Sequence, residues 1–381
     1  MPPGAGLPGG AGAAEHRGRL LRLARARRML IAVGVAVAVL GGGLGAWAAG
    51  AGPFEDPRHC WGAWQDRGEG GFFSGHGSRS GTDDPPTPER PRGTCTVVRT
   101  IASVEQTLKV TYGPAPEDPA ERMEWLGDAL FPDAVPLPDG LPGVVDAGNG
   151  LLVLPERCDT ADGRPTAVRM EGTDGREQDY GTPHSLDLGG TREAAVLLTA
   201  AANRGMELAG CADGEPLRTT SPVLTLPPGD ESGPHERTCG IPGLGIQGSE
   251  ALLRRLRPQV GTVTRQLQTC SVTDPPRFTG KPRRKERLHL GLAMIAEPRL
   301  AALAGDAAGA GAPARGWRGT GAFTTGHALV RAECAGRPTT FLMLTETDAG
   351  TGARPDYFTA FTDAVTQRLG CAPLAPGRTG R

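Results

Sequence analysis

Eight cysteines carry the clearest chemistry in this chain of 381 residues. Their thiols could form disulfides or, as thiolates, bind a metal. They are Cys60, Cys95, Cys158, Cys211, Cys239, Cys270, Cys334 and Cys371. The intervals between them are 35, 63 and 53 residues in the first four and 31, 64 and 37 in the second four. An even number of cysteines in a repeated pattern predicts disulfides in two matching halves.

Four cysteines in each half allow three pairings. We expect the first to pair with the second and the third with the fourth, because these pairs close the shorter loops. Each bridge would then stabilise its half by roughly 3 to 4 kcal/mol in the chain-entropy model. Oxidised cysteines are no longer thiolate ligands, so the same pattern argues against a metal site at these residues.

The seven histidines form no pair at metal-ligand spacing. His59 lies near Trp61 and Trp64, which predicts a local apolar cluster. His289 alternates with Leu288 and Leu290, a pattern that predicts a strand with the imidazole facing solvent.

Nucleophile motifs are also missing. There is no G-x-S-x-G elbow. His184, Ser185 and Asp187 are neighbours in the chain, but such neighbours seldom reach the geometry of a catalytic triad. We therefore predict no catalytic, metal-binding or cofactor-binding residue and no cofactor, and the protein is more typical of a non-enzyme than of an enzyme.

Two further motifs have ordinary explanations. Residues 243–248 match the dinucleotide fingerprint G-x-G-x-x-G, but no strand precedes them, as that motif requires. The basic cluster at residues 281–287 is typical of a solvated loop. A contact with an anionic envelope polymer or a lipid headgroup is the alternative.

The elements around the cysteines repeat as well. Gly-Arg-Pro-Thr follows Cys158 at residues 163–166 and follows Cys334 at residues 336–339. Short apolar runs on both sides of each motif predict a hairpin in each half, with strands at 151–154 and 167–170 and at 328–330 and 340–344. These hairpins would carry the third cysteine of each half.

Helices are predicted beside these strands. Residues 192–208 and 357–369 are each followed by Gly-Cys, and glycine commonly ends a helix. Pro119 and Pro298 are placed to begin helices after the strands at 96–112 and 287–295, and Asp118 can cap the first of them. The composition of residues 67–93 predicts a disordered loop. At the corresponding place in the second half, a helix is predicted at 249–256.

An apolar segment near the N-terminus predicts a membrane anchor. Residues 29–54 contain no charge, and residues 29–48 would form a helix of roughly 30 Å, which matches a bilayer core. Six arginines and one glutamate precede the segment, which predicts a cytoplasmic N-terminus and an exported remainder. A cleaved signal peptide ending near residues 46–48 is the alternative. The lipid bilayer would then be a partner through residues 29–51.

The exported part is mildly acidic, with 35 basic and 41 acidic residues. Nucleic-acid binding requires clustered Lys and Arg, so this balance argues against nucleic acid as a partner.

The chain resembles uncharacterised membrane-anchored proteins of actinobacteria. The resemblance rests on the anchor, on Cys-Trp-Gly at residues 60–62, on the Leu-Val strand before Cys334 and on Leu-Gly-Cys at residues 369–371. It covers roughly residues 29–371. It implies a location in the cell envelope and carries no known activity.

We therefore predict an α+β protein with an N-terminal transmembrane helix followed by two tandem domains. Each domain would have a small antiparallel sheet, helices and two disulfides. The expected segments are a cytoplasmic tail at 1–28, a transmembrane helix at 29–51, domains at 57–213 and 237–373, and a linker at 214–236. The expected function is non-enzymatic binding of an envelope ligand or protein partner through a groove between the domains. The alternative is an extracytoplasmic hydrolase.

Overall fold

The computed structural model describes residues 58–65, 71–74, 77–175, 184–226, 235–274, 287–345 and 355–376. We call residues 58–226 the first half and residues 235–376 the second half. No helix among the described residues is both long and apolar enough to cross a membrane. The predicted span at residues 29–51 lies outside them.

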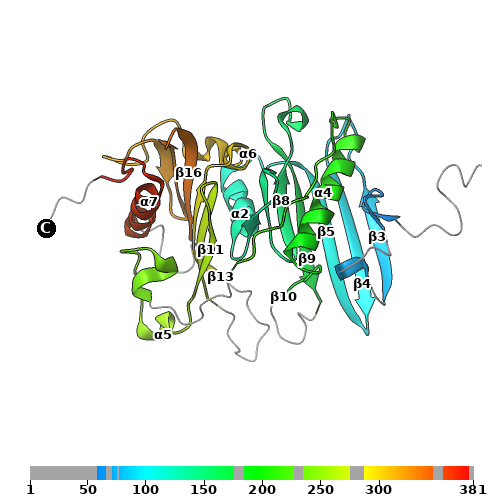
Figure 1. Cartoon of the computed structure of the whole chain (residues 1–381), viewed down its shortest axis with the longest axis horizontal. Coiled ribbons are helices and arrows are strands. Elements are labelled where there is room, and N and C mark those ends of the chain that lie inside the picture. Colours follow the sequence, from blue (N-terminus) through cyan, green and yellow to red (C-terminus); the bar gives the residue numbers. More distant parts are fainter. Residues whose placement is uncertain are drawn as a thin grey trace, which may run out of the picture. The chain divides into compact units, whose positions relative to one another are not determined.

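The first half contains an antiparallel sheet of eight strands in the order β3-β4-β5-β9-β8-β7-β6, with β10 paired to β9 (Figure 1). Its strands are β3 Ser78–Asp84, β4 Gly93–Ile101, β5 Val104–Pro114, β6 Val135–Pro136, β7 Gly143–Val145, β8 Asn149–Val153, β9 Thr166–Asp174 and β10 His184–Ser185. Its α-helices are α2 Pro119–Leu130 and α4 Thr191–Leu208, and β1 Arg58–His59 and β2 Trp64–Gln65 form a separate small pair.

The second half contains an antiparallel sheet of six strands in the order β11-β12-β13-β16-β15-β14. Its strands are β11 Arg257–Val263, β12 Leu267–Asp274, β13 Arg287–Ile295, β14 Thr320–Phe323, β15 His327–Cys334 and β16 Arg337–Leu344. Its α-helices are α5 Glu250–Leu253, α6 Pro298–Ala302 and α7 Pro355–Leu369. Short 3-10 turns in the two halves are η1 Gly71–Phe73, η2 Glu156–Cys158, η3 His235–Gly240 and η4 Gly305–Ala308.

The two sheets follow the same path. The order β3-β4-β5-β9-β8-β7 corresponds strand by strand to β11-β12-β13-β16-β15-β14. One helix follows the third strand in each half, α2 or α6, and another closes each half, α4 or α7.

Four disulfides occupy corresponding places in the two halves. Cys60–Cys95 and Cys239–Cys270 tie the segment before each sheet to its second strand. Cys158–Cys211 and Cys334–Cys371 tie the hairpin of each half to the end of its closing helix. The prediction of disulfides is confirmed, and the pairing is the one that the shorter loops favoured.

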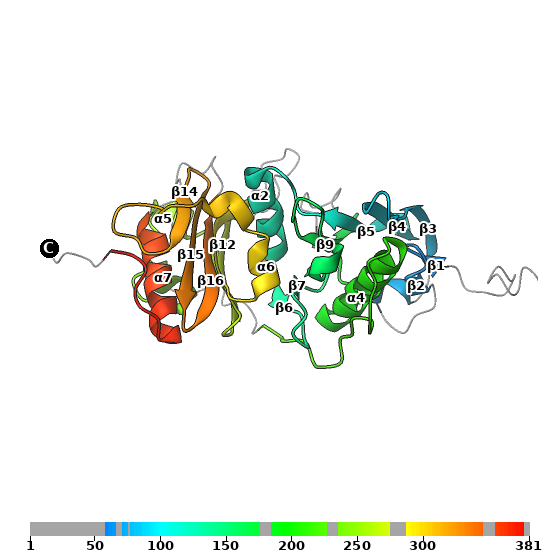
Figure 2. The same cartoon turned by 90° about the horizontal axis from the view of Figure 1, so that it is seen from above.

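Three hydrophobic cores hold these layers together. Leu198 and Met206 of α4 pack with the first sheet, and Phe358 and Phe361 of α7 pack with the second. The third core contains α2, α6 and side chains of both sheets, and Figure 2 shows these two helices between the strands of the halves. The halves therefore share a core. A Cβ added at Gly127 of α2 would come within 2.4 Å of Leu344 Cδ1, so the helix backbone lies directly against β16.

A half-buried ion pair also joins the halves. The guanidinium of Arg299, on α6, donates to both carboxylate oxygens of Asp159 at 2.8 and 2.6 Å and to the carbonyl of Leu154. Its side chain is 19% exposed and that of Asp159 is 14% exposed. Because little water reaches this pair, each charge depends on the other.

The helix starts follow local sequence. The carboxylate of Asp118 accepts from the backbone N–H of Glu121 at 2.8 Å, and Pro119 begins α2, as predicted. Glu297 caps α6 in the same way through the N–H of Leu300, with Pro298 at its first position. The prediction of an α+β fold with antiparallel sheets is confirmed.

Four local predictions were wrong. The strand expected at 96–112 is a hairpin of two strands, β4 and β5. Residues 78–84 within the expected loop at 67–93 form β3, a polar edge strand paired with β4 along its whole length. The helix expected at 249–256 covers only Glu250–Leu253. His289 is buried rather than facing solvent, because β13 is an inner strand of its sheet and both of its faces are covered.

Candidate binding site

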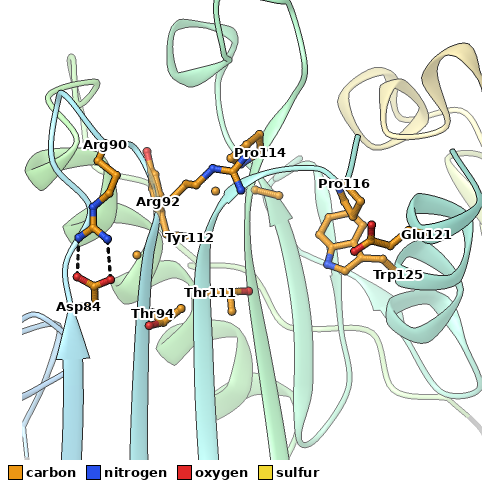
Figure 3. Close-up of a pocket in the computed structure, with 13 residues that line it drawn as sticks. Asp84, Arg90, Arg92, Thr94, Thr111, Tyr112, Pro114, Pro116, Glu121 and Trp125 are labelled. Carbon is orange, nitrogen blue, oxygen red and sulfur yellow. Dashed lines mark hydrogen bonds and ion pairs between the residues drawn. The ribbon is translucent and has the colours of Figure 1, made fainter. Parts of the chain in front are cut away.

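A pocket of ≈ 400 Å³ opens at one end of the first sheet. It lies among the loop that joins β3 to β4, the last residues of β5 and the first turns of α2 (Figure 3). Its polar and aromatic lining is Asp84, Arg90, Arg92, Thr94, Thr111, Tyr112, Glu121 and Trp125. We call it the first-half pocket.

The loop between β3 and β4 is folded tightly. Thr87 and Arg90 exchange backbone hydrogen bonds of 3.0 and 3.1 Å. The Arg90 guanidinium holds the Asp84 carboxylate through two hydrogen bonds of 2.8 and 2.5 Å, drawn in Figure 3. This hydrogen bonding lowers the pKa of Asp84. Gly93 permits the turn, because a Cβ there would lie 2.5 Å from Pro86 Cδ.

Arg92 supplies a positive charge to the pocket. Its stem crosses β5 beside Gly113, where an added Cβ would lie 3.5 Å from Arg92 Cγ. No carboxylate among the described residues forms an ion pair with its guanidinium, which lines the pocket near Pro114 (Figure 3). An arginine without a carboxylate partner in a pocket is suited to a ligand carboxylate or phosphate.

The opposite wall belongs to α2. Glu121 and Trp125 stand one helical turn apart and therefore share a face of the helix. Their side chains lie together in Figure 3. The Arg169 guanidinium lies 5.9 Å from the centroid of the Trp125 ring, which fixes the indole by a cation–π contact. The Glu121 carboxylate has no ion pair within the described chain, so it can accept hydrogen bonds from a ligand.

The floor is formed by β4 and β5. Thr94 and Thr111 are cross-strand neighbours and both line the pocket. Tyr112 is buried beneath it, with its ring against Gly205 of α4 and its hydroxyl 3.3 Å from Cys211 Sγ. Burial raises the pKa of Tyr112 to about 12. This phenol therefore keeps its proton near neutral pH.

The pocket is better arranged for binding than for proton transfer. A general acid or base works best with a pKa near the working pH. The pKa of Asp84 is lowered and that of Tyr112 is raised, so both move away from neutrality. The residues that line the pocket include no serine, cysteine or histidine.

The candidate residues considered from the sequence lie elsewhere. His59 stacks on Phe73 with ring centroids 5.7 Å apart and Phe73 contacts Trp64, which forms the expected aromatic cluster. Asp187 accepts from the backbone N–H groups of Gly189 and Gly190 and so shapes a turn. His184 and Ser185 form β10.

The two remaining motifs also lie apart from this pocket. The segment at 243–248 has no strand before it and places Leu244 and Ile246 in the core of the second half. Residues 281–286 of the basic cluster lie outside the described residues, as does part of the predicted linker at 214–236.

One group of potential metal ligands occurs in the described chain: Cys60, Asp83 and Cys95. Both cysteines belong to one disulfide, and the Asp83 carboxylate accepts the backbone N–H of Trp61 at 3.0 Å. These atoms are already used, and the disulfide offers no thiolate to a metal.

Sequence reasoning did not identify Arg92, Glu121 or Trp125 as site residues. Arg92 and Trp125 are 33 positions apart in the chain and meet only because β5 leads directly into α2. A solitary tryptophan with a glutamate one turn before it was the available signal, but it is equally typical of an amphipathic helix.

No protein-family model, curated protein or solved structure matches this chain. The fold and the pocket must therefore be interpreted from their own chemistry.

Proposed function

We propose that this chain is a membrane-anchored extracytoplasmic protein that binds a small ligand carrying both a carboxylate and an ammonium group. The observation that carries the proposal is the first-half pocket, where the Arg92 guanidinium and the Glu121 carboxylate line the same space and neither forms an ion pair with another described residue. Arg92 would bind the carboxylate of the ligand and Glu121 its ammonium group. Short peptides and amino acids have this chemistry.

The anchor and its orientation belong to the same proposal. The uncharged segment at 29–51 would cross the membrane, and the arginines before it would keep residues 1–28 in the cytoplasm. The four disulfides support an oxidising compartment for the rest of the chain.

A tandem duplication would account for the two halves. The strand order, the positions of four bridges and the repeated Gly-Arg-Pro-Thr motif all support it. The expected domains at 57–213 and 237–373 would then be two copies that share a core. The third core fills the contact between them, and each of the two pockets described here is lined by one half alone.

Calorimetry with three related dipeptides tests the binding proposal. Full-length protein in neutral detergent is titrated with alanyl-alanine, with its N-acetyl form and with its C-terminal amide. We expect the zwitterion to bind and each blocked form to bind about tenfold more weakly, because each lacks one charge-assisted hydrogen bond.

Matched variants test which residue binds each charged group of the dipeptide. Arg92→Gln should remove the preference for a free carboxylate, and Glu121→Gln should remove the preference for a free ammonium group. Arg218→Gln removes an exposed charge of the first half outside the pocket and should change neither. Equal binding of all three dipeptides, or none, would overturn the proposal. Cleavage of the dipeptide would favour the hydrolase instead.

A further inference from the structure

A second pocket, of ≈ 240 Å³, lies in the second half beside the Cys334–Cys371 bridge. Three arginines from separate elements line it: Arg265 from the turn between β11 and β12, Arg337 at the start of β16 and Arg368 in the last turn of α7. No acidic residue is among its lining residues. We call it the arginine pocket.

The elements that carry these arginines are fixed. The hydroxyl of Thr264 donates to the Leu267 carbonyl and accepts the N–H groups of Gln266 and Leu267, which orders the turn of Arg265. The Cys334–Cys371 disulfide ties the turn before Arg337 to the end of α7. The backbone positions of the three arginines are thus fixed at one end of the sheet.

Among the described residues, no carboxylate forms an ion pair with any of these three arginines. Arg368 donates to Gln268 Oε1 at 3.0 Å and to the Thr264 carbonyl at 3.1 Å, and both acceptors are neutral. Partial burial lowers its pKa without a carboxylate to oppose the shift. Arg265 and Arg337 form no ion pair with any residue in the described ranges. The nearby Glu297 carboxylate is engaged by the N–H of Leu300.

The equivalent arginine of the first half differs in this respect. Arg164 occupies the same place in Gly-Arg-Pro-Thr as Arg337. Its Nε lies 2.7 Å from the Asp162 carboxylate, and Glu117 lies 3.9 Å from its Nη1. The residue that corresponds to Asp162 in the second half is Ala335, which lines the arginine pocket. The second half keeps the arginine and lacks the carboxylate.

We propose that the arginine pocket binds a phosphate group. Three guanidinium groups match a doubly charged tetrahedral anion better than a single carboxylate, and their planar forks suit phosphate oxygens. The pocket also exceeds the size of one phosphate, which leaves room for the group that carries it. The site belongs to the second half and does not depend on the proposed function of the first-half pocket.

Calorimetry on the full-length chain in neutral detergent tests this site. Inorganic phosphate, glycerol 3-phosphate and acetate are titrated at constant ionic strength and pH 8, where a phosphate monoester is a dianion. Both phosphates should bind saturably, and acetate should bind at least about tenfold more weakly. Equal affinity for acetate and phosphate would overturn the assignment of ligand.

Variants then locate the binding. Arg337→Gln and Arg265→Gln should each weaken phosphate binding by about tenfold or more, since each removes a charged donor. Arg337→Lys keeps the positive charge but loses the planar pair of N–H donors, so it should lower the phosphate affinity less than Arg337→Gln does. Arg315→Gln removes an exposed charge outside the pocket and should leave the affinity within about twofold. The three side chains replaced in these four variants are exposed, so folding should survive and is checked by the thermal midpoint.

The most direct variant restores the carboxylate of the first half. Ala335 has φ of +50°, a conformation that Asp tolerates better than Ala, so Ala335→Asp should fold. The carboxylate that this substitution introduces should pair with Arg337 and so abolish phosphate binding. Phosphate binding that survives both Ala335→Asp and Arg337→Gln would overturn the proposal and identify nonspecific ion association.

A competition experiment with lipids identifies whether the phosphate belongs to a lipid headgroup or to a soluble compound. Phosphatidic acid, whose headgroup is a phosphate monoester that can carry two negative charges, is added to the detergent micelles, with phosphatidylcholine, whose phosphodiester carries one, as the control. If the lipid competes with glycerol 3-phosphate in the wild type and does not compete in Arg337→Gln, the ligand of the arginine pocket is an anionic lipid headgroup. Retained binding of glycerol 3-phosphate without lipid competition supports it with a soluble phosphate compound.

Discussion

The two halves share strand order and bridge positions but differ at the ends of their sheets. In the first half, an eight-residue loop follows β3 and a twelve-residue helix follows β5, and together they wall the first-half pocket. In the second half the corresponding turn has three residues and α6 has five. Its pocket uses the end of the closing helix instead. Shared strands with different connections therefore give two sites of different charge.

The parts that the two halves share and the parts in which they differ have separate roles. The sheets and bridges supply rigidity, and the chemistry comes from side chains at their edges. Arg164 and Arg337 illustrate the point. The same motif gives an arginine paired with Asp162 in the first half, and in the second half an arginine that forms no ion pair with another described residue.

The largest effect should come from removing equivalent bridges. Cys158→Ala with Cys211→Ala opens a loop of 53 residues, and Cys334→Ala with Cys371→Ala opens one of 37. The chain-entropy model predicts a loss of about 4 kcal/mol in the free energy of unfolding for either pair. Urea unfolding followed by tryptophan fluorescence measures both. Losses that differ by more than about 2 kcal/mol would show that the bridges are not equivalent.

A smaller effect should come from breaking the ion pair between the halves. Arg299→Met leaves the half-buried Asp159 carboxylate without its cation and should lower the free energy of unfolding by about 2 kcal/mol, between the values for exposed and fully buried pairs. Arg254→Met, which removes an exposed pair with Glu250, is the control and should change it by less than about 1 kcal/mol.

The shape of the unfolding curve sharpens this test. If the shared core and the ion pair couple the halves, wild-type protein should unfold in one transition and Arg299→Met should separate it toward two. A variant as stable as the control, with one unchanged transition, would show that the core alone joins the halves.

Local sequence patterns predicted the parts of the fold that depend on local chemistry. The bridges, the capped start of α2 and the two hairpins follow from cysteine spacing, Pro119 and Gly-Arg-Pro-Thr. The hairpin of β4 and β5 was read as one strand, because its turn places Ala102 and Ser103 at positive φ where Gly or Asn is the usual signal. β3 was missed because its polar side chains suit an exposed edge.

The two pockets could not be predicted for a different reason. Arg265, Arg337 and Arg368 are widely separated in the sequence and meet only through the strand order. That order was not determined by the periodicity of any strand. The basic cluster at 281–287 is visible in the sequence because its charges are neighbours in the chain, whereas the three arginines of the pocket converge only in space.

The smallest effect concerns matching turns. In the turn between β7 and β8, the backbone N–H of Asp146 donates to the carbonyl of Asn149. In the turn between β14 and β15, the N–H of Thr324 donates to the carbonyl of His327 in the same way. The Asn149 amide donates to Asp146 in the first half. In the second half, the hydroxyl of Thr324 lies 3.0 Å from His327 Nδ1. Only the second of these turns contains an imidazole.

Burial lowers the pKa of His327 from its ordinary value of 6.5. The unfolded chain therefore binds a proton more readily than the folded one, and the free energy of unfolding should fall as the pH drops through 6.5 and level off below the folded pKa. His327→Asn introduces the residue of the first half and should remove this component from the thermal midpoint measured between pH 8 and pH 5. An unchanged pH profile in that variant would place the acid sensitivity in other groups and leave the two turns equivalent.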